Sequence, residues 1–162
     1  MTQITTAGRR GSTDERSAHA RIDAAAKLLR GVRGGAPENF VALLFGHTAP
    51  EDLIVYEATE LTALVRDAYA LLATRKPGAA KVRFEVPPAS AGDHLKSISV
   101  IEIVNDDMPF LVDSVMSELT ERGLEVRLVA HPILAAERDR KTGKLTAPPA
   151  AEIGRASCRE RV

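Results

Sequence analysis

The sequence predicts an α+β protein, in which a helical segment over residues 13–78 is followed by an incomplete split β-α-β unit over residues 79–147. Apolar residues recur at helical spacing up to the end of the first segment, and from Lys81 onward the period changes to two, as in a strand. A second short apolar run, residues 97–104, then leads into a further helical pattern. We expect residues 1–12 to be disordered and residues 148–162 to form a linker and tail.

The helical segment shows start and stop signals along its length. The capping-box pattern S/T-x-x-E occurs at residues 12–15 and again at residues 48–51, where it precedes a short turn of helix. Between them, Pro37 opens a helix that ends at Gly46, with Phe40, Val41, Leu44 and Phe45 on its apolar side. The clearest apolar stripe covers residues 61–72. We expect all of these helices to serve as packing surface.

Three strands are predicted in the second half. Residues 81–86 alternate between charged and apolar side chains, which indicates a strand. Residues 97–104 are rich in Ile and Val, which favours a largely buried strand, although Glu102 is expected at a rim. A helix over residues 109–122, closed by Gly123, separates this strand from a third one within residues 124–138.

The junction between the second strand and the helix is the candidate ligand site. Asn105, Asp106 and Asp107 are expected to end the strand and to cap the helix, because their side chains accept hydrogen bonds from free N–H groups. Pro109 fits the first helical position, where no N–H is needed. A loop of open N–H groups at a strand end can hold a small anionic or zwitterionic ligand, so we take Asn105, Asp106, Asp107, Met108, Pro109 and Phe110 as candidate binding residues.

Composition excludes several classes of function. The 22 basic and 22 acidic residues give a net charge of zero, which offers no basic face for nucleic acid. No apolar run approaches the length of a membrane span, and no export signal is present, so we expect a cytoplasmic protein. The histidines are scattered and Cys158 is the single cysteine, so neither a zinc site nor an internal disulfide is predicted. No glycine pattern for a nicotinamide cofactor follows a strand.

The amino-acid sequence of the second half resembles known families. The stretch IEIVNDDMPFLVDSVMSELTERGLEVRLVAHPIL, residues 101–134, is similar to the first half of an ACT domain, a ferredoxin-like βαββαβ fold. More narrowly, DDMPFLVDS at residues 106–114, the His131-Pro132 pair and the turn over residues 138–145 resemble the amino-terminal region of the large bacterial NAD-specific glutamate dehydrogenases. The similarity covers about half of the chain, and residues 56–78 more loosely.

This resemblance implies a non-catalytic part of a larger enzyme. The whole dehydrogenase would convert L-glutamate to 2-oxoglutarate and ammonium with NAD, while this segment would assist assembly or regulation, hold no cofactor and be inactive alone. The expected partners are the remainder of the dehydrogenase chain, further copies in a homo-oligomer and an amino-acid effector. Many ACT domains that bind amino acids carry glycine directly after the proline of the first loop. Here that position is Phe110, whose ring is expected to fill the approach to the loop.

Two other functions are compatible with the pattern. A free-standing ACT-type sensor would bind an amino acid at residues 105–110. A ferredoxin-like module for RNA would need stacking aromatic residues on its central strands, which offer only Phe84.

The last eleven residues, EIGRASCRERV at 152–162, resemble a translated sequencing adapter. The alternative is a disordered arginine-rich tail after Pro148-Pro149. If the adapter interpretation holds, Cys158 has no biological role, and the chain is expected to be the front end of a longer protein, because an ACT fold needs a second βαβ half.

Overall fold

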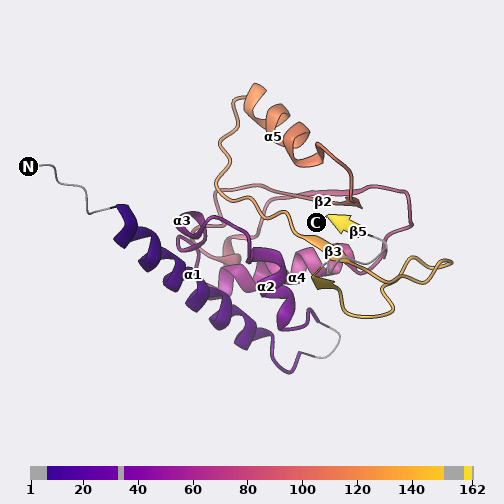
Figure 1. Ribbon diagram of the computed structural model, residues 1–162, viewed down its shortest axis with the longest axis horizontal. Coiled ribbons are helices and arrows are strands. Elements are labelled where there is room, and N and C mark those ends of the chain that lie inside the picture. The colour runs from indigo at the N-terminus through magenta and orange to yellow at the C-terminus, as the bar shows by residue number, and fades with distance from the viewer. Residues whose placement is uncertain (1–6, 33–34, 152–158, 162) are drawn as a thin grey trace, which may run out of the picture.

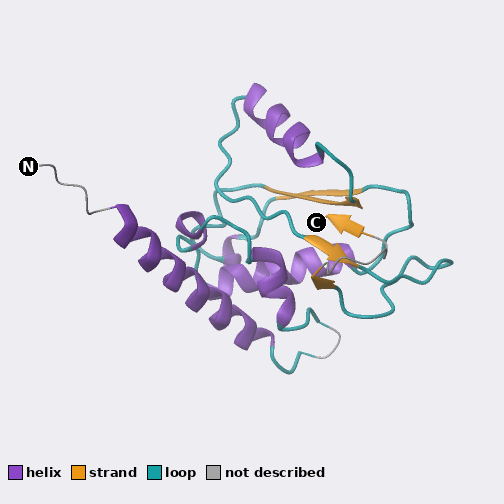
Figure 2. Cartoon of the chain, viewed as in Figure 1, coloured by secondary structure: helices purple, strands orange, loops and turns teal. Residues whose placement is uncertain are grey.

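The computed structural model describes residues 7–32, 35–151 and 159–161. Helices form the first half of the chain: α1 (Ala7–Leu29), α2 (Asn39–Phe45), α3 (Pro50–Leu53) and α4 (Ala58–Leu72). The second half contains β1 (Lys81–Glu85), the short 3-10 helix η1 (Ala89–Ala91), β2 (Val100–Asp106), α5 (Leu111–Glu121), β3 (Ile133–Ala135), β4 (Ala150–Ala151) and β5 (Arg159–Arg161). The predicted α+β class is confirmed (Figure 1, Figure 2).

The sheet has the strand order β1-β2-β5-β3-β4, and each neighbouring pair is antiparallel. Because β2 and β3 are both antiparallel to β5, they run parallel to each other with one strand between them. Helix α5 connects them, so β2, α5 and β3 form the predicted split β-α-β unit. Backbone pairing of β5 needs only N–H and C=O groups, which nearly every sequence supplies, so this pairing does not test the origin of residues 152–162.

The hairpin of β1 and β2 separates two layers. Helices α1 to α4 lie on one side of it, and α5 lies on the other (Figure 1). Register pairs Arg83 with Glu102 and Phe84 with Ile101, and paired residues share a face. The inner face, toward α4, therefore carries the charged residues of β1, while Val82 and Phe84 of β1 face the side of α5 together with Ile101 and Ile103 of β2.

One hydrophobic core spans both halves of the chain. The helices pack on one another and on the inner face of the sheet half, and the fully buried side chains come from both regions: Phe40, Leu53, Leu61, Leu72, Leu95, Val104 and Leu134. The core is mainly aliphatic, as expected from a sequence with 4% aromatic residues. The sheet half therefore completes the core of the helical half.

Basic side chains join the end of α4 to the sheet half. Lys81 Nζ donates to the carbonyl oxygens of Leu71 and Thr74, both at 2.9 Å, and an Arg138 Nη donates to the carbonyl of Leu72 at 2.7 Å. The last carbonyls of a helix have no partner within the helix, and the negative end of its dipole attracts cations. These contacts supply hydrogen-bond donors to carbonyl groups at the end of α4, and those from Lys81 hold β1 against the helix.

The helix boundaries confirm some predictions and correct others. Helix α2 buries Phe40, Val41, Leu44 and Phe45, as predicted. Helix α1 begins at Ala7, so Ser12 lies inside the helix and the predicted cap there is wrong. The cap of α3 is Ala49 and not Thr48, whose hydroxyl oxygen is buried without a hydrogen-bond partner among the described residues.

The strand boundaries also shift. Strand β1 matches its prediction, but β2 runs from Val100 to Asp106 and not over residues 97–104. Of the third predicted strand, only Ile133–Ala135 is formed. Glu102 was expected at a rim and instead lies between the sheet and α4, where its side chain is 10% exposed and pairs with Arg83.

A buried carboxylate organises the turn before β2. The Glu60 side chain is 2% exposed and accepts hydrogen bonds from the N–H groups of Glu57 at 2.8 Å and His94 at 2.9 Å, and it contacts His94 Nδ1 at 2.9 Å. Gly92 passes so close that a Cβ atom there would lie 2.1 Å from Glu60 Oε1. Burial raises the pKa of Glu60, but these hydrogen bonds outweigh burial and leave its pKa below the ordinary value.

We predict that Glu60→Gln destabilises the protein by about 2 kcal/mol at pH 7, because the amide cannot satisfy the converging donors as a carboxylate does. A lowered folded-state pKa means that the stabilisation is present above the ordinary pKa and is lost as pH falls through the folded value. Urea unfolding at pH 7 and at acidic pH measures this. The difference between the variant and the wild type should shrink in acid, and the exposed control Glu121→Gln should differ little at either pH. A pH-independent difference for Glu60→Gln would contradict the assignment.

Candidate functional site

The residues of the predicted ligand loop are partly engaged with one another and with the helical half. Asn105 and Asp106 are the last residues of β2, so they do not end the strand as predicted. The Asn105 amide donates to Met108 Sδ at 3.2 Å. The Asp106 carboxylate pairs with the guanidinium of Arg75, whose side chain is 1% exposed and also donates to the carbonyl of Ala79 at 2.9 Å. Asp106 therefore fixes the loop to the segment after α4.

Phe110 has an unusual backbone conformation. Its φ of 63° and ψ of 9° are left-handed, and it is the N-cap residue of α5, where no side-chain hydrogen bond caps the helix. The N-cap position is therefore Phe110 and not one of residues 105–107. Pro109 precedes the N-cap and does not occupy the first helical position. The positive φ gives a physical reason for glycine at this place in similar loops, because glycine adopts it without steric cost.

The loop borders neither of the two pockets described below. Phe110 is 74% exposed, and none of residues 105–110 lines the groove or the small pocket described next. The structure thus brings the predicted residues together as a turn, and ligand binding by them stays a prediction.

A groove of about 600 Å³ lies between the outer face of the sheet and α5. Phe84, Ile101 and Ile103 line it from the sheet. Opposite them is an apolar stripe of α5 at helical spacing, followed by residues of the next segment: Leu111, Val112, Val115, Met116, Leu119, Leu124, Val126 and Leu128. The lining is mainly apolar and also includes Glu125, Arg127 and His131, so the groove suits a partner with an apolar surface.

Helix α5 is only half-buried over this groove. None of its residues is buried, although it carries a clear apolar side. Its C-terminus is well formed: the N–H of Gly123 donates to the Thr120 carbonyl at 2.9 Å, and that of Leu124 donates to the Leu119 carbonyl at 3.0 Å. Gly123 has a φ of 69°, so the predicted stop is confirmed. The helix is specified locally, and its apolar side is only half-buried.

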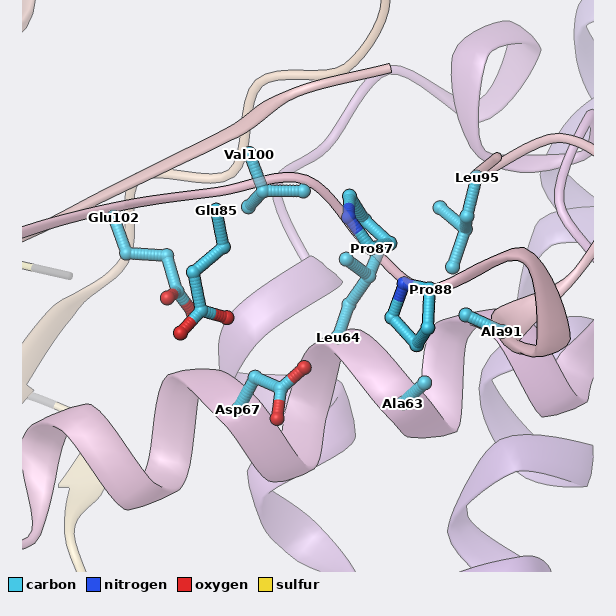
Figure 3. A pocket seen from close by; sticks show the side chains of 10 residues that line it. All are labelled: Ala63, Leu64, Asp67, Glu85, Pro87, Pro88, Ala91, Leu95, Val100 and Glu102. Atoms are coloured by element: carbon cyan, nitrogen blue, oxygen red, sulfur yellow. The ribbon is translucent and has the colours of Figure 1, made fainter. Parts of the chain in front are cut away.

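A smaller pocket of about 220 Å³ lies on the inner face, between α4 and the hairpin (Figure 3). The carboxylates of Asp67, Glu85 and Glu102 point into the space between these elements (Figure 3). Arg83 pairs with Glu102 at 2.5 Å and with Glu85 at 3.5 Å, and it donates to the Asp67 carbonyl at 2.6 Å. This cluster could not be predicted from the sequence, because the strand register decides which of its residues meet.

The charges in this cluster pair with one another between α4 and the sheet. Burial raises the pKa of Glu102 and of Asp67, and the positive charge of Arg83 opposes the rise in both. The pocket is below the usual size of a small-molecule site. No group of three metal-ligating residues occurs within the described ranges. We therefore assign the cluster to the joint between α4 and the sheet.

Comparison with known proteins identifies the family. Residues 40–162 match the family model described as the glutamate dehydrogenase ACT1 domain. The chain belongs to this family. The matched range covers α2 from Phe40 onward, α3, α4 and the whole sheet half. The ACT1 domain therefore contains both the groove and the acidic turn, the name used from here for the predicted ligand loop over residues 105–110. This confirms the resemblance inferred from residues 101–134.

A curated relative of the ACT1 chain is the NAD-specific glutamate dehydrogenase of Halomonas elongata. It is 30% identical over 102 residues, which are 63% of this chain and 6% of the relative. The chain thus spans a small fraction of the length of that relative. No solved structure matches. In the described part of the chain, no helix is both long and apolar enough to cross a membrane.

We predict that Phe110→Gly stabilises the ACT1 chain by about 1 kcal/mol, because it removes the cost of a left-handed conformation at a residue with a side chain. The exposed ring contributes little burial that would be lost. Met108→Gly is the matched control: Met108 lies in the same loop without a positive φ, so glycine there should destabilise. Thermal unfolding of both variants measures the two signs, and destabilisation by both would contradict the account.

Proposed function

We propose that this chain is a non-catalytic assembly or regulatory part of an NAD-specific glutamate dehydrogenase. The whole enzyme would oxidatively deaminate L-glutamate to 2-oxoglutarate and ammonium with NAD, in the cytoplasm, where such an enzyme would draw on the cellular NAD pool. The match to the ACT1 family supports this proposal over a free-standing amino-acid sensor. So does the 102-residue similarity to one part of a much longer NAD-specific dehydrogenase.

The observation that carries the assembly role is the open apolar groove. A monomeric surface rarely keeps a large contiguous apolar patch without a use. Here Phe84 is 65% exposed, Ile101 is 42% exposed, and the facing side of α5 buries no residue. We propose that the remainder of the dehydrogenase chain packs into this groove and thereby holds α5 in place. The further apolar residues Ile98, Val100, Ile103, Leu128 and Val129 are each only partly buried.

An effector role for the acidic turn has weaker support. Asp106 already pairs with a buried arginine, and the turn borders neither cavity. We propose that the turn is structural and that amino acids do not bind at residues 105–110. A sensor function would require those side chains to exchange their present partners for a ligand.

The purified chain should show no glutamate-dependent reduction of NAD, measured by absorbance of the reduced cofactor.

In a full-length dehydrogenase that carries this segment, Leu119→Asp should weaken assembly or alter effector response, because it places a charge in the groove. Glu118→Gln, a neighbouring change on the exposed side of α5, should leave both unchanged. Turnover by the isolated chain, or identical assembly and regulation of Leu119→Asp and wild type, would contradict the proposal.

A further inference from the structure

Strand β1 is an edge strand with an unusual distribution of side chains. Among the described strands its neighbour is β2, and the sheet order places β1 at one end. Val82, Phe84 and the following Val86 are 63%, 65% and 64% exposed. Edge strands of soluble proteins are normally protected from pairing by short length, charged side chains, proline, bulges or charges that point inward. The charges of β1 point inward, but Lys81 and Arg83 are already paired with α4 and Glu102, and the exposed face is apolar.

We propose that β1 pairs antiparallel with β1 of a second copy of this chain, with Phe84 on the two-fold axis. Residues whose numbers add to 168 then lie opposite each other. The two Phe84 rings meet at the axis, and each Val82 faces Val86 of the second copy. Cross-strand aromatic and β-branched pairs of this kind stabilise antiparallel sheets. The proline after Val86 has no N–H and ends the pairing.

Charge complementarity supports the same register. Partner residues in an antiparallel pair lie on one face, so each Arg83 is placed opposite Glu85 of the second copy. Within one copy, Glu85 Oε1 lies 3.5 Å from Arg83 Nε and its side chain is 47% exposed, so it can accept a second arginine without losing a buried contact. Two such pairs form, one on each side of the axis.

The neighbouring symmetric register fits less well. With Arg83 on the axis, the two arginines would lie directly opposite each other, which is unfavourable, and Val82 would face Phe84. The register centred on Phe84 avoids like charges and keeps apolar residues together. Each copy would continue the sheet of the other, so the outer apolar face would extend across both copies.

Sedimentation equilibrium of the 162-residue chain tests the interface. We expect a reversible dimer whose dissociation constant rises about tenfold or more in Glu85→Arg, because two attractive pairs become two repulsive ones. Glu121→Arg makes the same change of charge at an exposed site on α5 and should leave the constant unchanged. Far-UV circular dichroism of each variant checks that the fold is retained.

Disulfide capture tests the register. In a Cys158→Ser background, Phe84→Cys should form a covalent dimer on oxidation, because a residue on the axis faces its own copy. Val82→Cys alone should not, whereas Val82→Cys combined with Val86→Cys should. A chain that stays monomeric at high micromolar concentration, a dimer unaffected by Glu85→Arg, or cross-linking by Val82→Cys but not by Phe84→Cys would each overturn the proposal.

Discussion

The two faces of the β1–β2 hairpin determine most of this structure. Because side chains alternate along a strand, one register sends Val104 into the core and Ile103 to the opposite side. The inner face is further tied to α4 by Lys81 and Arg83, which donate to carbonyl groups of that helix. A slip of one residue would reverse both faces, moving Val104 out of the core and taking Lys81 and Arg83 away from α4. The helical half and the sheet half are therefore stabilised together.

The outer face of the hairpin carries apolar residues that the fold does not bury. Its apolar residues and the apolar side of α5 face each other across a groove without burying any residue of α5. The free edge of β1 presents the same face along its length. Both features are apolar surfaces of the kind that mark association sites. This is the physical basis for the assembly role proposed above.

Patterns that depend on local geometry were predictable from the sequence. The apolar side of α2, the alternation of β1 and the glycine stop after α5 follow from periodicity and from the backbone freedom of Gly123. The caps were not predictable, because serine or threonine three residues before glutamate is a short pattern, and α1 begins at Ala7 and not at Ser12. The left-handed Phe110 moved the start of α5 beyond Pro109. The pairs Arg83–Glu102 and Glu60–His94 join residues 19 and 34 positions apart, so no local sequence pattern predicts them.

Thiol labelling at the two faces of β2 tests the central claim most directly. In a Cys158→Ser background, cysteine is placed singly at Ile101, which is 42% exposed on the outer face, or at Val104, which is fully buried on the inner face. If one face seals the core and the other is open, Ile101→Cys reacts with a soluble thiol reagent at nearly the rate of the unfolded chain, while Val104→Cys is strongly protected and reacts through unfolding. Equal protection of the two thiols, or faster reaction at Val104→Cys, would contradict the account.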